Sequence, residues 1–452
     1  MNVANEVEEF RAGAAVHSKT RSERAGTEVA VVAGFIASAL VVMWLLSRPE
    51  APSGKGSSLP GPIRLAEVSS VLATIDTSRT DTLPGRWPQG RGRPRGNAMW
   101  GFDVITPFDT LWTIDTGFEF FSAPALVDEV LYLGCNDGRF RAVNASTGAT
   151  IWSRPVTCGL CGEAAVCSTA VYFGGQDGYV YALDRRSGRQ LWRSGLGYHV
   201  FSDVALLDTL VLAGNSQGSV AALNVANGYP VWSDSPGGVV LGPAFEDSVI
   251  VFTTESGRVR AYSPDGTILW SKSFSSQASP PSISEEKVFV GFSNGVVRCL
   301  GAGSGNILWQ LDLVQSQARS VLSRPVVRDT LVLVGSCSNF IHCLHAESGS
   351  LLWEQSFENW VQVPPVVGPS IAYVSSDDQR LHLLDLRTGE KLDSLEMGGY
   401  SGTAPLLANG TLYLGNTSGQ FFALVGTVPP PPPETEGEAA DSTVTEESTI
   451  DP

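Results

Sequence analysis

Two of the seven cysteines in this 452-residue chain, which also has five histidines, lie three positions apart. Cys158 and Cys161 have the C-x-x-C spacing of redox-active and metal-binding thiols. Gly162 follows in place of the histidine of a haem attachment motif, no Cys/His cluster has zinc spacing, and no thioredoxin-like βαβ pattern surrounds the pair. A local disulfide in an exported domain, or two free thiols, are the interpretations that remain.

The other thiols have a structural interpretation. Cys299 and Cys343 stand where other copies of a repeat, described below, have alanine, so we expect small buried side chains there. The odd total leaves at least one cysteine unpaired or paired between chains. No nucleophile elbow, phosphate-binding loop or metalloprotease motif occurs in the sequence. We therefore predict that the protein is not an enzyme and has no catalytic residues, no bound metal and no cofactor.

A third group of residues suits recognition rather than catalysis. Aromatic side chains that break the repeat precede the first strand of several units, and polar turn residues are expected on the same face. The set is Phe118, Phe120, Phe121, Tyr198, His199, Phe201, Trp360 and Tyr400, with Asp137, Asp177 and Asp377. Aromatic residues beside polar ones are typical of a partner-binding face. The alternative is that several of these rings plug a central channel or pack between structural units.

The elements that position these residues repeat with a period near 40 residues. An apolar residue followed by tryptophan recurs at Trp112, Trp152, Trp192, Trp232, Trp270, Trp309 and Trp353, and a degenerate copy has Leu392. A turn marker recurs at Gly138, Gly178, Gly218, Gly257, Gly295, Asn339, Gln379 and Gly419. Short β-branched or alternating runs separated by Gly/Asp/Ser/Asn turns indicate strands and hairpins. Eight such units predict an all-β, eight-bladed propeller with four-stranded antiparallel blades.

The two ends of the repeat array complement one another. The last unit, Ala404 to Leu424, has three strands and lacks the strand that carries tryptophan. A spare copy of that strand, Phe108–Asp115, precedes the first unit. We predict that it pairs with Gln420–Leu424 and completes the last blade, which removes two exposed sheet edges. The repeated tryptophans are expected to fill the gaps between neighbouring blades.

Two segments resemble a known repeat. Tyr181–Trp192, with the sequence YALDRRSGRQLW, and Ala142–Trp152 are similar to the PQQ-like β-propeller repeat, whose consensus reads YALDxxTGxxxW. Over residues 100–426 the layout also resembles the BamB family of lipoproteins of the outer-membrane assembly machinery. That resemblance implies an eight-bladed propeller that binds protein or peptide partners. The chain differs from the family in having an apolar N-terminal segment instead of a lipidated cysteine, and in its acidic tail.

A different function is implied by other proteins with this repeat. The enzymes among them hold pyrroloquinoline quinone and a calcium ion beside a pair of adjacent cysteines. No Cys-Cys dipeptide occurs in this sequence. We keep a quinoprotein dehydrogenase as the alternative to a non-catalytic scaffold, and a ligand- or carbohydrate-binding ectodomain as a second alternative.

The N-terminal part predicts a membrane anchor. Val29–Leu46 is an eighteen-residue run in which Ser38 is the one polar residue. Such a run is long enough to cross a hydrocarbon core of about 30 Å, and no signal-peptidase site follows it. We therefore expect a single-pass signal anchor with residues 1–28 in the cytoplasm and the propeller outside it. A cleaved signal peptide is the competing interpretation.

Composition predicts what the remaining segments do. Residues 47–99 are rich in Pro, Gly, Ser and Arg and indicate a flexible linker, whereas residues 427–452 begin with a proline run and continue as an acidic tract expected to be disordered. The tail accounts for seven acidic residues of a chain with a net charge of −16. The rest is mildly acidic, so a basic surface for nucleic acid is not expected.

Overall fold

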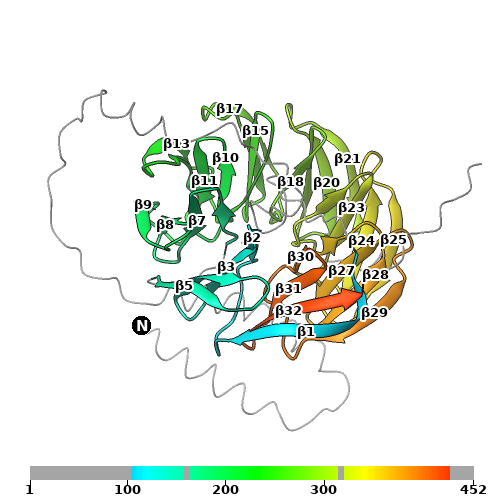
Figure 1. Cartoon of the computed structure of the whole chain (residues 1–452). Coiled ribbons are helices and arrows are strands. Elements are labelled where there is room, and N and C mark those ends of the chain that lie inside the picture. The colour runs from blue at the N-terminus through cyan, green and yellow to red at the C-terminus, as the bar shows by residue number, and fades with distance from the viewer. Residues whose placement is uncertain (1–102, 157–161, 314–319, 428–452) are drawn as a thin grey trace, which may run out of the picture. The chain divides into compact units, whose positions relative to one another are not determined.

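The computed structural model describes residues 103–156, 162–313 and 320–427. The interpretations placed on residues 1–28, 29–46, 47–99 and 427–452 lie outside these residues, apart from Thr427, and so does the disulfide proposed for Cys158 and Cys161. Among the described residues no helix has the length and apolar character needed to cross a membrane. What the structure does describe is built from strands and turns (Figure 1).

The described residues form eight antiparallel sheets of four strands, which confirms the predicted all-β, eight-bladed propeller. Blade 1 consists of β2 (Ala125–Val127), β3 (Val130–Cys135), β4 (Arg139–Asn144) and β5 (Thr150–Pro155), and blade 2 of β6 (Ala165–Val166), β7 (Ala170–Gly174), β8 (Tyr179–Asp184) and β9 (Gln190–Gly195). Blade 3 consists of β10 (Ala205–Leu207), β11 (Leu210–Gly214), β12 (Val220–Asn224) and β13 (Pro230–Asp234), and blade 4 of β14 (Val240–Glu246), β15 (Val249–Thr254), β16 (Arg258–Tyr262) and β17 (Ile268–Ser273).

The second half of the ring repeats the pattern until the last blade. Blade 5 consists of β18 (Ser282–Ser284), β19 (Lys287–Gly291), β20 (Val296–Gly301) and β21 (Ile307–Asp312), and blade 6 of β22 (Val326–Arg328), β23 (Leu331–Gly335), β24 (Phe340–His345) and β25 (Leu351–Ser356). Blade 7 consists of β26 (Val366–Val367), β27 (Ile371–Ser376), β28 (Arg380–Asp385) and β29 (Lys391–Glu396). Blade 8 consists of β30 (Leu406–Ala408), β31 (Thr411–Gly415) and β32 (Gln420–Thr427), together with β1 (Ile105–Asp115). First strands of neighbouring blades contact one another, so they surround the centre and the fourth strands form the rim.

Closure of the ring occurs as predicted. β1, drawn in cyan beside the red β32 in Figure 1, pairs antiparallel with it, for example Thr110 with Leu424 and Asp115 with Gln420. The two strands lie about 300 residues apart in the sequence, and their pairing satisfies the backbone groups of what would be an open edge.

The repeated tryptophans join each blade to the next one, as expected. Each indole N–H donates at 2.6–3.0 Å to a backbone carbonyl in the third-to-fourth-strand turn of the following blade. The pairs are Trp112 with Ala145, Trp152 with Arg185, Trp192 with Val225, Trp232 with Pro264, Trp270 with Ala302, Trp309 with Ala346, and Trp353 with Leu386. A half-buried or buried polar ring is thereby both packed and hydrogen-bonded.

The small residue opposite each tryptophan explains two of the cysteines. Cys299 pairs across the strands with Trp309, and Cys343 with Trp353, where blade 2 pairs Ala182 with Trp192. Both thiols are fully buried, and burial raises the pKa of each to about 12. They are therefore protonated, inert side chains that act as small hydrophobes, as predicted.

A glycine in the following blade's turn makes room for each indole. A Cβ added to Gly305 would lie 2.5 Å from the Trp270 ring, and the residue has φ +66°. At Gly410, which has φ +74°, an added Cβ would have no atom within 4 Å. Gly410→Ala is therefore expected to lower the free energy of unfolding by about 1–2 kcal/mol, which is the cost of the left-handed conformation alone.

Gly305→Ala is expected to lower the free energy of unfolding by the same amount and by about a further 1–3 kcal/mol, because the Trp270 indole must move. Urea unfolding midpoints of the two variants measure the difference. Equal losses of stability in the two variants would mean that the packing of the Trp270 indole does not require a glycine at position 305.

The joint between blades 7 and 8 has a different construction, which explains the degenerate repeat. Blade 8 has no turn between its third and fourth strands, because these are β32 and β1, so a tryptophan at Leu392 would have no turn to dock on. Leu392 is 51% exposed. The lead-in residues fill the joint instead: the Val104 N–H and C=O both bond the Tyr373 hydroxyl, at 2.6 and 2.7 Å, and the Asp103 carboxylate accepts from Ser370.

Candidate recognition face

The connections of the propeller sort themselves onto two faces because its strands alternate in direction. The loop face consists of the blade-to-blade loops and the second-to-third-strand turns, and the turn face holds the other two sets of turns. Loops and turns of the loop face are bonded together: the Asn136 N–H donates to the Glu119 carbonyl at 3.1 Å and the Thr417 N–H to the Tyr400 carbonyl at 2.9 Å. The predicted recognition residues lie in these loops and turns.

Four of the predicted aromatic residues are on the surface of the loop face. Phe118 is 53% exposed, Phe121 40%, Tyr198 50% and Tyr400 50%. Phe118 and Tyr400 flank the turn of blade 8: a Cβ on Gly419 would touch the Phe118 backbone, and Thr417 bonds Tyr400. Phe118 and Tyr400 therefore lie beside blade 8, whereas Tyr198 lies farther round the ring, beside the Gly178 turn of blade 2.

The remaining aromatic residues of the predicted set are buried or partly buried. Phe120 is fully buried and packs against Phe421 with ring centroids 5.4 Å apart, so it belongs to the core and not to a surface. The His199 ring, which is partly buried, bonds the Gln176 carbonyl and lies 5.3 Å from the Phe201 ring. Trp360 is partly buried. Of the eight predicted aromatic residues, Phe120 is thus in the core, three are partly buried, and Phe118, Phe121, Tyr198 and Tyr400 are exposed.

The predicted acidic residues fix the turns of the loop face. Asp137 forms an ion pair with Arg141, and Asp177 accepts from the Tyr181 hydroxyl. Asp377 accepts from the Gln362 side-chain amide at 2.6 Å, and burial raises the pKa of this carboxyl. These side chains give the face its shape and some negative charge, and they are not arranged as a catalytic pair.

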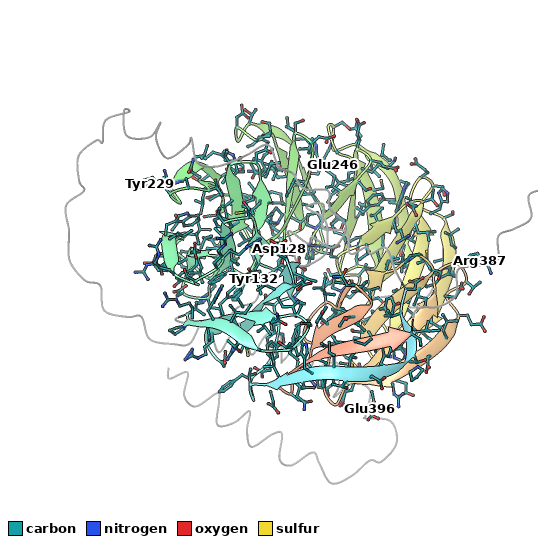
Figure 2. The ribbon with its side chains drawn as sticks, in the orientation of Figure 1. Asp128, Tyr132, Tyr229, Glu246, Arg387 and Glu396 are labelled. Carbon is teal, nitrogen blue, oxygen red and sulfur yellow. The ribbon has the colours of Figure 1, made fainter. Side chains whose placement is uncertain are left out.

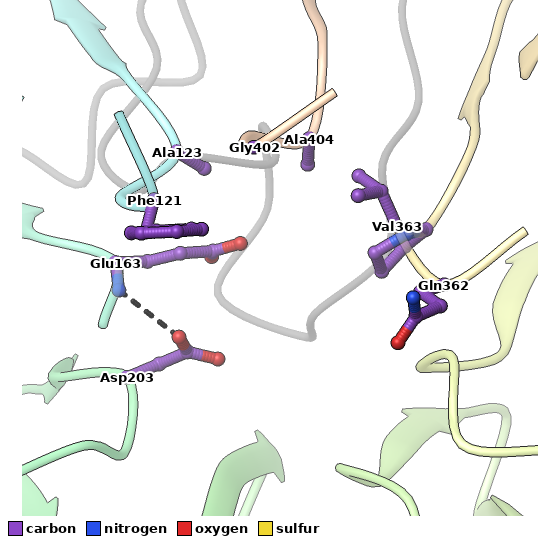
Figure 3. Close-up of a pocket in the computed structure, with 9 residues that line it drawn as sticks. Phe121, Ala123, Glu163, Asp203, Gln362, Val363, Gly402 and Ala404 are labelled. Carbon is purple, nitrogen blue, oxygen red and sulfur yellow. Dashed lines mark hydrogen bonds between the residues drawn. The ribbon is translucent and has the colours of Figure 1, made fainter. Parts of the chain in front are cut away.

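A pocket of about 160 Å³ opens at the centre of this face (Figure 3). It is lined by Phe121, Ala123, Glu163, Asp203, Gln362, Val363, Pro364, Gly402 and Ala404. Figure 3 shows the Phe121 ring over the Glu163 side chain, with Asp203 next to it. The backbone N–H of Glu163 donates to the Asp203 carboxylate at 3.0 Å, which ties blade 2 to blade 3. We call this cavity the channel-mouth pocket.

An ion pair spans the centre of the ring beside the pocket. The Arg324 guanidinium, on the loop into blade 6, bonds the Asp203 carboxylate on the loop into blade 3. Arg324 has a side-chain exposure of 3%, and Asp203 has 20%. The pair links the loops into blades 3 and 6, which are 121 residues apart in the sequence.

Sequence reasoning missed Glu163, Asp203 and Arg324, although a signal was present. All three stand two residues before the first strand of a blade, where blades 1 and 8 have Ala123 and Ala404. Aligning the blades on their first strands would have shown charged side chains at a repeat position that faces the axis.

Comparison with known proteins agrees with this architecture. The family model for the outer membrane protein assembly factor BamB matches residues 106–239, 216–293 and 293–427. The structure of BamB from Moraxella catarrhalis is 16% identical, with a TM-score of 0.60 over 70% of this chain and 99% of that one. No curated protein sequence matches this chain.

Two enzymes have the same fold. The quinohemoprotein alcohol dehydrogenase from Comamonas testosteroni is 13% identical, with a TM-score of 0.67 over 81% of this chain and 85% of that chain. A europium-containing methanol dehydrogenase is 12% identical, with a TM-score of 0.64 over 76% of this chain and 98% of that one. At these identities the likeness concerns the fold alone.

The channel-mouth residues do not fit the quinone cofactor of such enzymes. Pyrroloquinoline quinone is a tricarboxylate, and the pocket presents the carboxylates of Glu163 and Asp203, with the nearby Arg324 already bound to one of them. Its volume of about 160 Å³ is below the roughly 300 Å³ at which ligand pockets usually begin. Within the described part of the chain, no three Cys, His, Asp or Glu side chains converge as a metal site would require.

Proposed function

The chain belongs to the family of the outer membrane protein assembly factor BamB, and from that premise we propose that it is a non-catalytic scaffold that binds protein or peptide partners through its loop face. The observation that carries this proposal is the set of four exposed aromatic side chains on one face, Phe118, Phe121, Tyr198 and Tyr400. Exposed aromatic rings beside polar turns are the usual composition of a binding hot spot. Assembly of envelope or outer-membrane proteins is the process we propose for it.

The same proposal includes the location of the propeller. We infer that Val29–Leu46 anchors the chain in a membrane and that the propeller lies on the extracytoplasmic side. The eighteen-residue apolar run supports this, as does the family's role at the outer membrane. Protease treatment of sealed vesicles of known sidedness, with N-terminal sequencing of the mature chain, tests it. A mature chain that begins after residue 46 would overturn the anchor.

A cross-linking pull-down from membranes tests the partner-binding face. The double variant Phe118→Ser/Tyr400→Ser is expected to lose at least about 90% of the partner captured by the wild type, because truncating two central aromatic residues commonly costs 2 kcal/mol or more of binding energy. Tyr229→Ser is the matched control. Tyr229 is 71% exposed and lies at the outer edge of blade 3, in a turn of the opposite face (Figure 2). Equal loss in the control, or none in the double variant, would overturn the assignment of this face.

The alternative, a quinoprotein dehydrogenase, makes a different prediction. From the carboxylate-lined pocket we expect isothermal titration calorimetry to detect no stoichiometric binding of pyrroloquinoline quinone in the presence of calcium. Two pocket carboxylates repel a tricarboxylate, and no unpaired arginine lines the pocket among the described residues. Saturable binding at one quinone per chain, accompanied by dye-linked alcohol oxidation, would restore the enzyme interpretation.

A further inference from the structure

A second cavity lies on the turn face, at the joint of blades 4 and 5. It has a volume of about 400 Å³, which is within the usual range of ligand pockets. Its walls are the turn between β14 and β15, with Asp247, the turn between β18 and β19, with Glu286, and the turn between β20 and β21, with Ala302. We call it the joint pocket. We propose that it binds an arginine side chain of a partner protein. It lies on the face opposite Phe118 and Tyr400, so the inference is independent of the function proposed above.

The joint of blades 1 and 2 shows which group the repeat can place here. Asp128, in the first-to-second-strand turn of blade 1, forms an ion pair of 2.7 Å with Arg185, in the third-to-fourth-strand turn of blade 2. The Arg185 side chain is 14% exposed, so it is largely enclosed by the protein. A hydrogen bond between two charged groups is among the stronger kinds in proteins. A joint of this construction therefore binds a guanidinium group when the chain supplies one.

Backbone geometry shows that the joint pocket occupies the equivalent position three blades further on. Asp247 stands where blade 1 has Asp128, because each has φ +49° in a two-residue turn closed by a strand pair. Ala302 stands where blade 2 has Arg185. The carbonyl of each accepts the indole N–H of the preceding blade's tryptophan, and the N–H of each donates to the first-to-second-strand turn of its own blade. Blade 5 thus has a methyl group, between two glycines, where blade 2 has an arginine side chain.

The two exposed carboxylates of the joint pocket have no counterion. Asp247 and Glu286 are both exposed, and within the described part of the chain neither carboxylate forms an ion pair or a hydrogen bond. No lysine or arginine is among the described residues that line the pocket. The Glu286 backbone N–H donates to the Glu246 carboxylate at 3.0 Å, which ties the turns of the two blades together. The pocket therefore keeps the negative member of the Asp128–Arg185 pair and lacks the positive one.

An arginine fits this arrangement better than a metal ion does. No three acidic, histidine or cysteine side chains of the described residues are grouped as a metal ion requires. A guanidinium is planar and has five N–H donors, so it can engage one carboxylate with two of them and still offer donors to a second, whereas the ammonium of lysine is a point charge. The aliphatic stem of the arginine would pack on Val249 and Ala302, which also line the pocket.

Three acetylated and amidated pentapeptides test the inference on the full-length protein. Each has glycine at the four outer positions, and the central residue is arginine, citrulline or glutamate. Citrulline has the length and shape of arginine without its charge. Saturation-transfer difference NMR is expected to show about tenfold tighter binding of the arginine peptide than of the citrulline peptide, because a hydrogen bond to a charged group contributes about that factor. The ratio is expected to fall as the salt concentration rises. Equal binding of these two peptides, or binding of neither, would overturn the inference.

Matched variants locate the effect. Asp247→Asn is expected to abolish most of the preference for arginine. Asp208→Asn is the control and is expected to keep it. Asp208 is exposed at the same turn position of blade 3, with φ +50°, but the next blade has Pro264 at the position of Ala302. Equal loss in both variants would mean that the peptide responds to the overall charge of the protein, and the pocket would then be the wrong assignment.

Ala302→Arg tests the same assignment in the opposite direction. This variant supplies the guanidinium from within the chain, as blade 2 does with Arg185. It is expected to unfold cooperatively in urea and to bind the arginine peptide no better than the citrulline peptide, and a retained preference would contradict the inference. The triple variant Arg91→Gln/Arg93→Gln/Arg95→Gln removes arginines from the chain's own linker. An unchanged affinity supports a partner protein as the source of the arginine, whereas a gain in affinity would assign the pocket to the linker and overturn the assignment to a partner.

Discussion

A chain that begins at Phe121 is expected to show no cooperative unfolding transition, while one that begins at Asn97 unfolds like the full-length protein. The shorter chain lacks β1, so blade 8 loses its rim strand and β32 becomes an open edge. It also lacks Trp112, which joins blade 8 to blade 1, and Val104, which fills the joint with blade 7. Loss of the tryptophan alone costs about 3–5 kcal/mol in a packed site. The three losses together approach the 5–15 kcal/mol that a whole domain has available.

Differential scanning calorimetry and solubility of the two chains measure this effect. A synthetic peptide covering residues 103–120, added to the shorter chain, is expected to restore a transition and raise its midpoint with concentration, as any ligand of the native state does. If the two chains had equal midpoints without the peptide, the ring would be closed by contacts other than β1.

The architecture could be predicted because its determinants are repeated. Each blade contains the same local signals, and the tryptophan and the turn glycine interact through a spacing that every copy preserves, such as Trp270 with Gly305. Counting strands was then enough to pair β1 with β32, although they lie at opposite ends of the array. The odd joint between blades 7 and 8 was visible as Leu392, but its filling by Asp103 and Val104 was not, because those residues belong to no repeat.

The recognition face was harder to predict because burial depends on distant neighbours. Phe118, Phe120 and Phe121 lie within four positions of one another, yet the central ring is in the core, against Phe421. Its backbone N–H donates to Asn416, as Val200 donates to Gly175 and Val361 to Ser336 at the equivalent positions of other blades. Those valines are fully buried, so the repeat held the information that this position points inward. The choice between Phe118 and Phe121 as contact residues has no such internal comparison.

Aligning the blades would place Asp203 and Arg324 at equivalent repeat positions but would not show that the two side chains pair. Their ion pair leads to the second large prediction. Asp203→Ala is expected to lower the free energy of unfolding by about 3–5 kcal/mol, because it leaves the Arg324 charge buried without its counterion. Arg324→Met is expected to cost less, about 1–2 kcal/mol. The remaining Asp203 carboxylate is 20% exposed, so water reaches it, and the Glu163 N–H still donates to it.

The double variant Asp203→Ala/Arg324→Met separates charge burial from loss of packing. Replacing both partners of a buried pair by apolar groups is often neutral, so the double variant is expected to be more stable than Asp203→Ala alone. Urea denaturation of all four proteins, with unchanged slopes as the check that the same transition is observed, gives the coupling. A loss for Arg324→Met as large as that for Asp203→Ala would mean that the guanidinium stabilises the ring by filling space. In that case its charge would be incidental, and the pair would no longer be a link between blades 3 and 6.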